Sequence, residues 1–406
     1  MYKQPAVFYP GYSINEAVLR LFHFSNNAYF HFCFITQLSI LMTQDLLYQI
    51  ALTLVPNIGC VRAKTLIESY KTAENIFKAK RKELSAVENI GTVRAASIKS
   101  FQDFSKAEDE MRFLEKYKIQ PLFITDKCYP QRLLHCYDSP TLLYYRGNAD
   151  LNASKIISIV GTRNNTDYGK QLTEKLVREL KDMNVLIVSG LAFGIDAIAH
   201  KSALQYEQET VGVLAHGLHT IYPRQHKSLA KEIMLHGGVL TEFRNGEEPD
   251  KHNFPKRNRI VAGMSDATVV IETAIKGGSM ITAELANNYN RDVFALPGKT
   301  TDTKSAGCNH LIQNNKAILF TDAKELTESL GWQSKKINKK QQKELFIELT
   351  DEEKIIVDIL KQKETTHVDE LNIRSNLSSS SVAAAILNLE LQNVITSLPG
   401  KMYKIV

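Results

Sequence analysis

The stretch Phe254-Pro255-Lys256-Arg257-Asn258-Arg259-Ile260-Val261-Ala262-Gly263 places three cationic side chains within four positions, between apolar residues that anchor it to a core. Desolvating an unpaired charge costs several kcal/mol, so this cluster is expected to face water or an anion. Guanidinium groups bind phosphate oxygens bidentately, and the Asn between the two Arg residues can orient the remaining lone pairs. A solvated helix start explains the basic run equally well. The loops elsewhere in the chain decide between these two interpretations.

Short β-branched runs alternate with helical patterns from about Gln120 to Thr321, which predicts an α/β domain with a mostly parallel sheet and right-handed crossovers. Several runs are continuously apolar, as strands covered on both faces must be. The predicted strands are Pro121–Thr125, Leu142–Arg146, Ile156–Val160, Val185–Val188, Thr210–Leu214, Val239–Thr241, Thr268–Ile271, Val293–Ala295 and Ile318–Phe320.

Four glycine-containing turns follow predicted strands of this sheet, at the strand ends where ligands of such sheets gather. They are Gly161-Thr162-Arg163, Ser189-Gly190-Leu191-Ala192-Phe193-Gly194-Ile195-Asp196, Gly277-Gly278-Ser279-Met280-Ile281-Thr282 and Pro297-Gly298-Lys299. Glycine lets backbone amides approach an anion, and Ser or Thr adds a rotatable hydroxyl. One such turn means little. Four of them, with Arg163, Lys256, Arg257 and Arg259 nearby, predict a phosphate-binding site.

Catalytic groups are not evident. Neither G-x-G-x-x-G nor G-x-x-x-x-G-K-[ST] occurs, so no nucleotide cofactor is expected. Asp196 and His200 lie four residues apart, but helix capping and a core position explain them better than acid–base chemistry. His216 and His219 lack companion ligands, so no metal is expected. With no nucleophile, base and oxyanion hole assembled, the sequence predicts a binding protein and not an enzyme.

The bulk properties fit a multidomain soluble protein. A chain of 406 residues predicts two or three domains. A formal net charge of +6 permits a polyanionic partner without requiring one. The five cysteines are scattered, which fits a reducing cytoplasm, and no window is apolar for long enough to form a membrane helix.

Residues 1–41 are rich in Phe, Tyr and His and show neither helical nor strand periodicity. The apolar run Phe30–Met42 lacks the small-residue cleavage site of a signal peptide. We therefore expect Met42 to be the natural start and residues 1–41 to be a non-native or disordered extension. A peptide covering them in protein from native cells would refute this.

A repeat follows in residues 42–110, where Asn57-Ile58-Gly59-Cys60-Val61-Arg62-Ala63 recurs as Asn89-Ile90-Gly91-Thr92-Val93-Arg94-Ala95. Each copy lies between amphipathic helices, and we expect a positive φ at Gly59 and Gly91. This is the helix-hairpin-helix pattern, which usually binds a backbone phosphate. Asn stands where the hairpin usually begins with Gly, which favours a structural or partner-docking role.

The C-terminal part predicts a linker and a small domain. Residues 332–349 form a Lys-rich polar tract, read as a basic linker. In residues 350–406, Thr350-Asp351-Glu352-Glu353 is a capping box, and Ser378–Ser381 caps a third helix. Two strands around Pro399-Gly400 complete a winged-helix pattern. The exposed face of its third helix is mostly Ser, Ala, Asn and Glu, which favours protein contact or regulation over base readout.

The motifs taken in order resemble the DNA-processing protein A family (DprA, also called Smf) from about Met42 to Val406. They are Ile159-Val160-Gly161-Thr162-Arg163, Ser189-Gly190-Leu191-Ala192-x-Gly194-Ile195-Asp196-x-x-Ala199-His200, Tyr222-Pro223, Phe254-Pro255-x-Arg257-Asn258-Arg259, Gly278-Ser279-x-Ile281-Thr282-Ala283 and Leu296-Pro297-Gly298. Thr162 stands where Ser is common and Cys308 where Thr is common. Both departures affect local hydrogen bonding and not the expected activity.

The resemblance implies an extended Rossmann fold over residues 111–331, between an N-terminal helix-hairpin-helix (SAM-like) domain and a C-terminal winged helix. It implies a cytoplasmic homodimer that binds single-stranded DNA without cleaving it, protects incoming strands during natural transformation and loads the RecA recombinase. Family pocket residues carry onto Arg163, Ser189, Gly190, Arg257, Asn258, Arg259, Gly278 and Ser279. The predicted DNA-binding set also includes Gly161, Gly194, Lys256 and Thr282, with Phe254 and Tyr222 as base-stacking candidates.

Two other functions stay open at this point. Lys276-Gly277-Gly278 with Glu284 partly resembles the phosphate loop of nucleotide phosphoribohydrolases, which have a related fold, but Met280 and Ile281 stand where that loop needs Gly and Thr. A nucleoid-type duplex binder is the other alternative. Comparing duplex and single-strand affinity at equal salt separates it from the leading interpretation.

Overall fold

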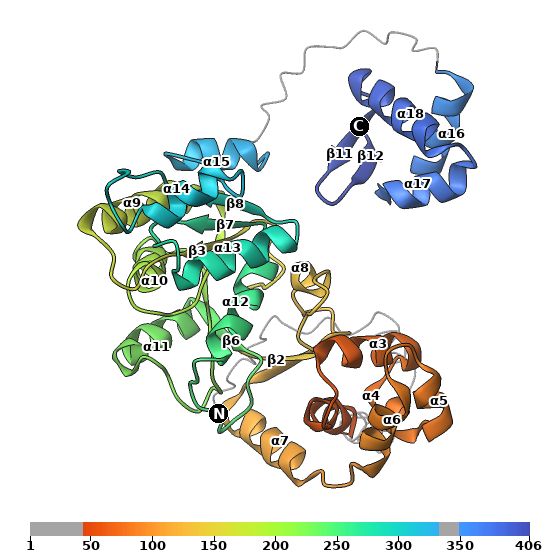
Figure 1. The fold of residues 1–406 in the computed structure, drawn as a ribbon, viewed down its shortest axis with the longest axis vertical. Coiled ribbons are helices and arrows are strands. Elements are labelled where there is room, and N and C mark those ends of the chain that lie inside the picture. The colour runs from red at the N-terminus through yellow and green to blue at the C-terminus, as the bar shows by residue number, and fades with distance from the viewer. Residues whose placement is uncertain (1–43, 333–348) are drawn as a thin grey trace, which may run out of the picture. The chain divides into compact units, whose positions relative to one another are not determined.

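The structure is a computed structural model that describes residues 44–332 and 349–406 (Figure 1). It divides into two compact units, Met1–Gln333 and Ser334–Val406. The predictions made for residues 1–41 lie outside the described residues, as does nearly all of the predicted linker 332–349. No helix of the described ranges is long and apolar enough to cross a membrane.

The first unit begins with helices. They are a helix over 44–54, α3 (Cys60–Tyr70), α4 (Ala73–Lys78), α5 (Arg81–Ala86), α6 (Gly91–Ser100) and α7 (Ser105–Tyr117). The helix over 44–54 and α3 form one hairpin around the first copy of the repeat, and α5 and α6 form the other around the second. The helix-hairpin-helix prediction is confirmed.

Asparagine makes the left-handed turn in both hairpins. Asn57 has φ 66° and Asn89 has φ 61°, a conformation that Asn tolerates better than most residues with a side chain. Gly91 has the expected positive φ of 65°, but Gly59 is extended with φ −89°. The expectation is therefore wrong at Gly59, because Asn57 has already turned the chain and Gly59 enters α3 as an extended N-cap.

A nine-stranded sheet follows the helices, and its strands lie where the sequence predicts them. They are β1 (Gln120–Phe123), β2 (Leu142–Gly147), β3 (Ile156–Val160), β4 (Leu186–Ser189), β5 (Thr210–Val213), β6 (Gly237–Thr241), β7 (Ala267–Val270), β8 (Asp292–Ala295) and β9 (Ile318–Leu319). The spatial order is β1-β2-β6-β5-β4-β3-β7-β8-β9. β1 and β2 pair antiparallel and β2 pairs antiparallel to β6, whereas every other pair is parallel. The mostly parallel sheet is confirmed.

Helices cover both faces of the sheet. They are α8 (Gln131–Leu134), α9 (Asp167–Glu179), α10 (Ile195–Gln205), α11 (Lys227–Leu235), α12 (Asn253–Gly263), α13 (Gly278–Asn288), α14 (Ala306–Gln313) and α15 (Ala323–Ser329), with 3-10 turns at Lys181–Met183 and Arg224–His226. The pleat of β3 sends Ile156 and Val160 into the core with α12 and α13, and Ile157 and Ile159 into the core with α9 and α10. This explains why β3 is apolar at nearly every position.

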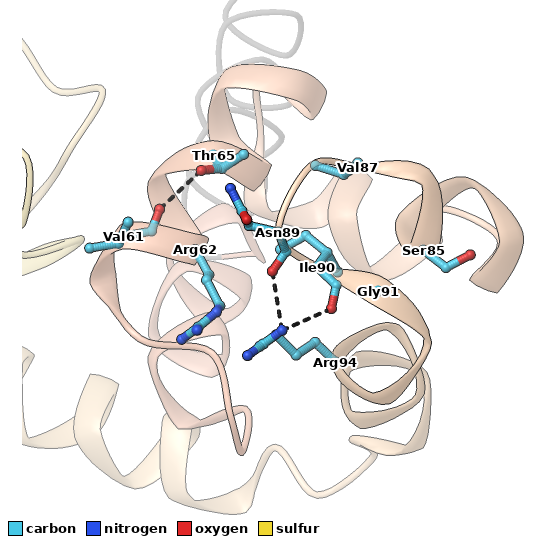
Figure 2. A pocket seen from close by; sticks show the side chains of 9 residues that line it. All are labelled: Val61, Arg62, Thr65, Ser85, Val87, Asn89, Ile90, Gly91 and Arg94. Atoms are coloured by element: carbon cyan, nitrogen blue, oxygen red, sulfur yellow. Dashed lines mark hydrogen bonds between the residues drawn. The ribbon is translucent and has the colours of Figure 1, made fainter.

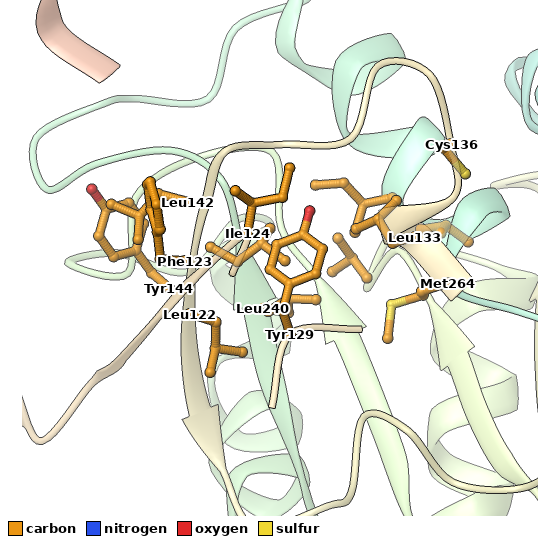
Figure 3. Packing of buried hydrophobic residues seen from close by; sticks show 14 of the residues in the cluster. Leu122, Phe123, Ile124, Tyr129, Leu133, Cys136, Leu142, Tyr144, Leu240 and Met264 are labelled. Atoms are coloured by element: carbon orange, nitrogen blue, oxygen red, sulfur yellow. The ribbon is translucent and has the colours of Figure 1, made fainter. Parts of the chain in front are cut away.

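The helices of residues 44–117 share one hydrophobic core with the sheet, so this unit is continuous. The segment between β1 and β2 makes the connection (Figure 3). Tyr129 is fully buried in it, and its hydroxyl donates to the Pro140 carbonyl at 2.6 Å. Lys64 of α3 donates to the carbonyls of Leu134 at 2.7 Å and Cys136 at 3.2 Å. Apolar packing and these hydrogen bonds hold the first hairpin against α8.

The strand order reverses at β3. From β3 the chain builds β4, β5 and β6 on one side and β7, β8 and β9 on the other. The loops after β3 and β7 therefore leave the sheet in opposite directions, and a crevice opens at the carboxyl ends of the strands between them. This reversal places the glycine-containing turns after β3, β4 and β7 at the same rim.

The second unit is a winged helix, as predicted. It contains α16 (Asp351–Leu360), β10 (Thr366–His367), α17 (Val368–Ser375), α18 (Ser379–Leu391), β11 (Ile395–Leu398) and β12 (Met402–Ile405). The capping box forms, since Thr350 Oγ1 accepts from Glu353 N at 3.3 Å and Glu353 Oε2 accepts from Thr350 N at 2.9 Å. Ser378 caps α18 through Ser381 N at 3.1 Å.

Candidate nucleic-acid interface

A pocket of about 600 Å³ lies at the carboxyl ends of β3, β4 and β7, at the strand-order reversal. Its lining comes from the three glycine-containing turns and α12. The residues include Gly161, Thr162, Arg163, Gly190, Lys251, Phe254, Arg257, Asn258, Thr273, Gly278, Ser279 and Thr282. Nine of these belong to the predicted DNA-binding and stacking residues, so folding brings most of that set together.

Arg163 supplies accessible positive charge to the pocket. It is exposed in the loop after β3, and its guanidinium lies 5.3 Å from the centroid of the Phe254 ring. No ion pair engages Arg163 in the described residues. A cation over an aromatic face is attracted by the ring electrons, which holds the guanidinium at the pocket mouth. Arg163 is therefore free to bind a phosphate.

Arg257 lies under the pocket and not in front of it. Its side chain is buried and donates from one terminal nitrogen to the carbonyls of Gly190 and Val213. A Cβ on Gly190 would meet that nitrogen at 2.5 Å, so only glycine allows this approach. Burial lowers the pKa of Arg257 to about 10, and buried Asp196 opposes the shift. Arg257 stays charged at neutral pH and, as a lining residue, lends a positive field to the pocket floor.

Arg259 points away from the pocket. It forms a buried ion pair with Glu242, lies 3.8 Å from Asp138 Oδ2, and donates to Cys60 Sγ at 3.4 Å. Lys256 is exposed but lies outside the pocket lining. The prediction that this basic cluster faces water or an anion is therefore wrong for Arg259, whose charge is paired with internal carboxylates. Helix α12 distributes the cations, with Arg257 beneath the pocket and Arg259 against the helical region.

Ser189 and Gly194 also have structural roles here. Ser189 is fully buried and its hydroxyl donates to the Ile159 carbonyl at 2.6 Å, tying β4 to β3. Gly194 is the N-cap of α10 with φ 76°, and neither residue lines the pocket. Asp196 accepts from Gly190 N at 3.1 Å and holds the turn closed. Ser189 and Gly194 thus shape the loop between β4 and α10, but neither lies at the surface of the pocket.

The start of α13 forms the anion-binding side of the pocket. Its N-cap, Gly277, provides no side-chain cap, so the first amides of an 11-residue helix lack a partner from that side chain. Ser279 lines the pocket, is buried, and its Oγ has no hydrogen-bond partner in the described residues. Asn258 Nδ2 donates to the Gly278 carbonyl at 3.5 Å. Free amides, a free hydroxyl and the helix dipole together suit a phosphate.

Aromatic side chains extend the site on the Arg163 side. Tyr222 is 46 % exposed, and its ring centroid lies 6.0 Å from that of Phe254 at an interplanar angle of 54°. Phe193 is 42 % exposed beside His226. These rings line a smaller cavity that shares Arg163, Phe254 and Arg257 with the main pocket. The stacking candidates Phe254 and Tyr222 thus adjoin the free cation.

The titratable groups near the pocket have structural partners. His200 is fully buried, its Nδ1 lies 2.7 Å from Thr210 Oγ1, and burial lowers its pKa to about 3. Glu272 accepts from Thr166 N at 2.9 Å before α9, and Glu242 pairs with Arg259. Cys308 Sγ lies 3.6 Å from the Ile271 carbonyl, so a thiol serves where a hydroxyl is common. These contacts explain each group without a catalytic role.

Lys251, Thr273 and Ala274 line the pocket but belong to none of the turns or stretches that the sequence singled out. Lys251 is exposed in the turn before α12 and adds a second cation to the pocket. Lys251 lies three residues before Phe254, but this position indicates a place in the pocket only when α12 is known to begin at Asn253. Thr273 lies just beyond the carboxyl end of β7, where ligands of such sheets gather, so it could have been predicted on that ground.

Models of known protein families match three parts of the chain. Residues 120–331 match the family model of the DNA recombination-mediator protein A. Residues 343–401 match the DprA winged helix domain, and residues 49–109 match a helix-hairpin-helix motif.

Individual relatives agree with the family models. The chain is 33% identical over 393 residues to protein Smf of Synechocystis sp., covering 88% of this chain and 98% of the relative. It is 40% identical over 221 residues to DNA processing protein DprA of Streptococcus pneumoniae, covering 54% of this chain and 78% of the relative. The X-ray structure of DprA from Streptococcus pneumoniae superposes with a TM-score of 0.53 at 36% identity, covering 67% of this chain and 98% of that one. This chain therefore belongs to the DNA recombination-mediator protein A family, also called DprA or Smf.

Proposed function

We propose that this protein binds single-stranded DNA in the pocket between β3, β4 and β7, without sequence preference and without cleaving it. The observation that carries the proposal is the position of the unpaired Arg163 over the Phe254 ring, in a pocket whose other side is the start of α13. The cation can bind one phosphate of the strand, the aromatic ring can stack on a base, and the free amides can bind a second phosphate.

A single strand suits this site better than a duplex. In a duplex the bases are stacked on one another, so Phe254 and Tyr222 could not reach their faces. A single strand exposes both its bases and its phosphates. Since every base has a stacking face and every nucleotide a phosphate, the binding would not depend on sequence.

In the cell we propose that the bound strand is DNA taken up during natural transformation. The protein, as a homodimer in the cytoplasm, would protect this strand and load the RecA recombinase onto it. The support is membership of a family named for recombination mediation. A mediator must hold a strand tightly enough to shield it and loosely enough to release it, which suits a shallow pocket using few charges.

Charge reversal at Arg163 tests the proposal. We expect Arg163→Glu to lower the affinity for an oligothymidylate at least about tenfold, because it replaces the free cation with a repelling charge. Arg178→Glu is the matched control, since Arg178 is exposed on α9 outside the pocket. Fluorescence anisotropy at a series of salt concentrations measures both variants. Equal affinity of the two variants would contradict the proposal.

Two further measurements separate the alternatives. Tighter binding of a duplex than of a single strand at equal salt would favour a nucleoid-type duplex binder. Release of free base from nucleoside monophosphates would favour the phosphoribohydrolase alternative. We expect weaker duplex binding, no free base, and an intact oligonucleotide after incubation.

A further inference from the structure

A second cavity, of about 700 Å³, lies in the helical region between the two hairpins (Figure 2). It is lined by Val61, Arg62, Thr65, Ser85, Val87, Asn89, Ile90, Gly91 and Arg94. Arg62 and Arg94 occupy the same position in the two copies of the repeat, each three residues after the repeat glycine. The repeat thus delivers one arginine from each hairpin to one cavity.

Neither arginine is neutralised. Among the described residues neither forms an ion pair, and no Asp or Glu lines the cavity. Arg94 donates from one terminal nitrogen to the carbonyls of Asn89 at 3.2 Å and Ile90 at 3.3 Å, which fixes its guanidinium (Figure 2). The Nε atoms of Arg62 and Arg94 are both buried and have no hydrogen-bond partner. Buried, unsatisfied cationic donors cost free energy unless a ligand accepts from them.

Two other arginines of this unit are neutralised by carboxylates. Arg259 pairs with Glu242, and Arg132 Nε lies 2.6 Å from Asp266 Oδ1. In both of these cases the fold supplies a carboxylate to the arginine, whereas Arg291 bonds only to the carbonyls of Arg132 and Gly263 and forms no ion pair in the described residues. At Arg62 and Arg94 the fold brings two like charges into one cavity and supplies no carboxylate. An anion between them would stabilise that arrangement, because it attracts both charges.

The backbone adds donors to the same cavity. Gly91 is the first residue of α6, a helix of 10 residues whose N-cap, Ile90, provides no side-chain cap. Val61 lies in the first turn of α3, whose N-cap, Gly59, also provides none. Both Gly91 and Val61 line the cavity. The positive ends of two helices therefore adjoin the two arginines.

We infer that this cavity is a second phosphate-binding site, occupied by a backbone phosphate of a DNA strand longer than the pocket at β3, β4 and β7 can hold. The inference rests on the proposed function, which supplies the strand. A guanidinium pair without a carboxylate selects a phosphodiester over a peptide segment of ordinary composition. A nucleic-acid backbone also provides a phosphate at each nucleotide, so one further along the strand can fill this site while the first pocket is occupied.

The experiment uses the full-length protein and a length series of oligothymidylates, from about six nucleotides, within the range of a single site, to about forty. The principal variant is Arg62→Glu. It fills the cavity with a carboxylate that pairs with Arg94, so the fold is retained while phosphate is excluded. The second variant, R62Q/R94Q, removes the charges without adding one. K106E/K116E is the control, because both lysines are exposed on α7 outside the cavity.

We expect short strands to bind Arg62→Glu as they bind the parent protein. Long strands should bind about five- to tenfold more weakly, and their salt dependence should fall by about one to two released counterions. The same loss in R62Q/R94Q, and none in K106E/K116E, would assign the effect to the cavity. Unchanged binding of long strands by both cavity variants would overturn the inference and leave protein docking as the role of this region.

Arg163→Glu separates this failure from failure of the proposed function. If Arg163→Glu weakens every length while the cavity variants change none, only the second site is wrong. If Arg163→Glu changes no length, the proposed function is wrong, whatever the cavity variants do.

Discussion

The guanidinium of Arg163 lies 5.3 Å from the centre of the Phe254 ring, although one residue follows β3 and the other begins α12. Phe254 also lies 6.0 Å from the Tyr222 ring, at a tilt of 54°. One ring thus connects the free cation to a second exposed aromatic. A base placed against these rings would bring its own phosphate toward Arg163, so stacking and charge act on the same nucleotide.

Replacing Phe254 tests this arrangement. We expect Phe254→Ala to weaken single-strand binding by about 1–3 kcal/mol, because it removes both the stacking face and the support of Arg163. Phe254→Tyr keeps a ring and should bind nearly as the parent protein does. Tyr168→Ala is the control, since Tyr168 is 55 % exposed on α9 outside the pocket. Anisotropy titration measures all three, and equal binding by Phe254→Ala and the control would refute the stacking role.

Arg257 leads to a different expectation, because it supports the fold. We expect Arg257→Ala to lower the free energy of unfolding by about 3–5 kcal/mol, since it leaves buried Asp196 without its cation and the carbonyls of Gly190 and Val213 without their donor. Denaturant titration followed by circular dichroism measures this loss. A stable Arg257→Ala variant with weakened DNA binding would show instead that Arg257 contacts the ligand.

The sequence revealed the sheet but not the roles of the arginines, and the reason is physical. Strands such as β3 are covered on both faces, so consecutive residues are apolar and the strand is recognisable from the sequence alone. The partners of Arg259, in contrast, come from other parts of the fold. Glu242 follows β6, which lies four strands away from β7 in the sheet order, Asp138 lies between α8 and β2, and Cys60 begins α3. No local pattern reports a partner that only tertiary folding supplies.

The Arg259–Glu242 ion pair can be measured by a double-mutant cycle. We expect Arg259→Met alone to cost about 3–5 kcal/mol of unfolding free energy, because it leaves Glu242 buried and charged. Glu242→Gln in the same protein should recover part of that loss, since the remaining side chain is neutral. Strictly additive losses in the two single variants and the double variant would show that the pair is not coupled.

His200 makes the stability of the protein depend on pH in a defined direction. Its pKa is lowered to about 3 in the folded state by burial, whereas the unfolded state keeps the ordinary value of 6.5. Between these values only the unfolded state binds the proton. The contribution of His200 is therefore complete above pH 6.5 and is lost as pH falls, at about 1.4 kcal/mol per unit.

We expect His200→Gln to flatten that part of the profile, because Gln stays neutral and can still bond to Thr210. Unfolding free energies from denaturant titrations at pH 7, 6 and 5 (roughly the window in which the unfolded imidazole gains its proton) measure the difference. Buried carboxyls with raised pKa, such as Asp196, act in the opposite direction in both proteins and cancel in the comparison. Parallel profiles for the two proteins would show that the pKa of His200 is not lowered in the folded state.

Ser279 provides the sharpest separation of binding from stability. Its Oγ is buried at the start of α13 with no partner in the described residues, so the hydroxyl contributes no hydrogen bond to the fold. Ser279→Ala should therefore leave the melting temperature unchanged or slightly raised, because a buried unsatisfied group is removed. If that hydroxyl binds a phosphate oxygen, the same variant should bind single strands at least about 10-fold more weakly, since one hydrogen bond to a charged group contributes about 1.5–3 kcal/mol. Ser158→Ala is the control with the opposite signature, since Ser158 lies 2.8 Å from Thr268 Oγ1 in the sheet and should affect stability alone. Undiminished binding by Ser279→Ala would show that the phosphate is held by the amides of α13 and Arg163 without help from the side chain.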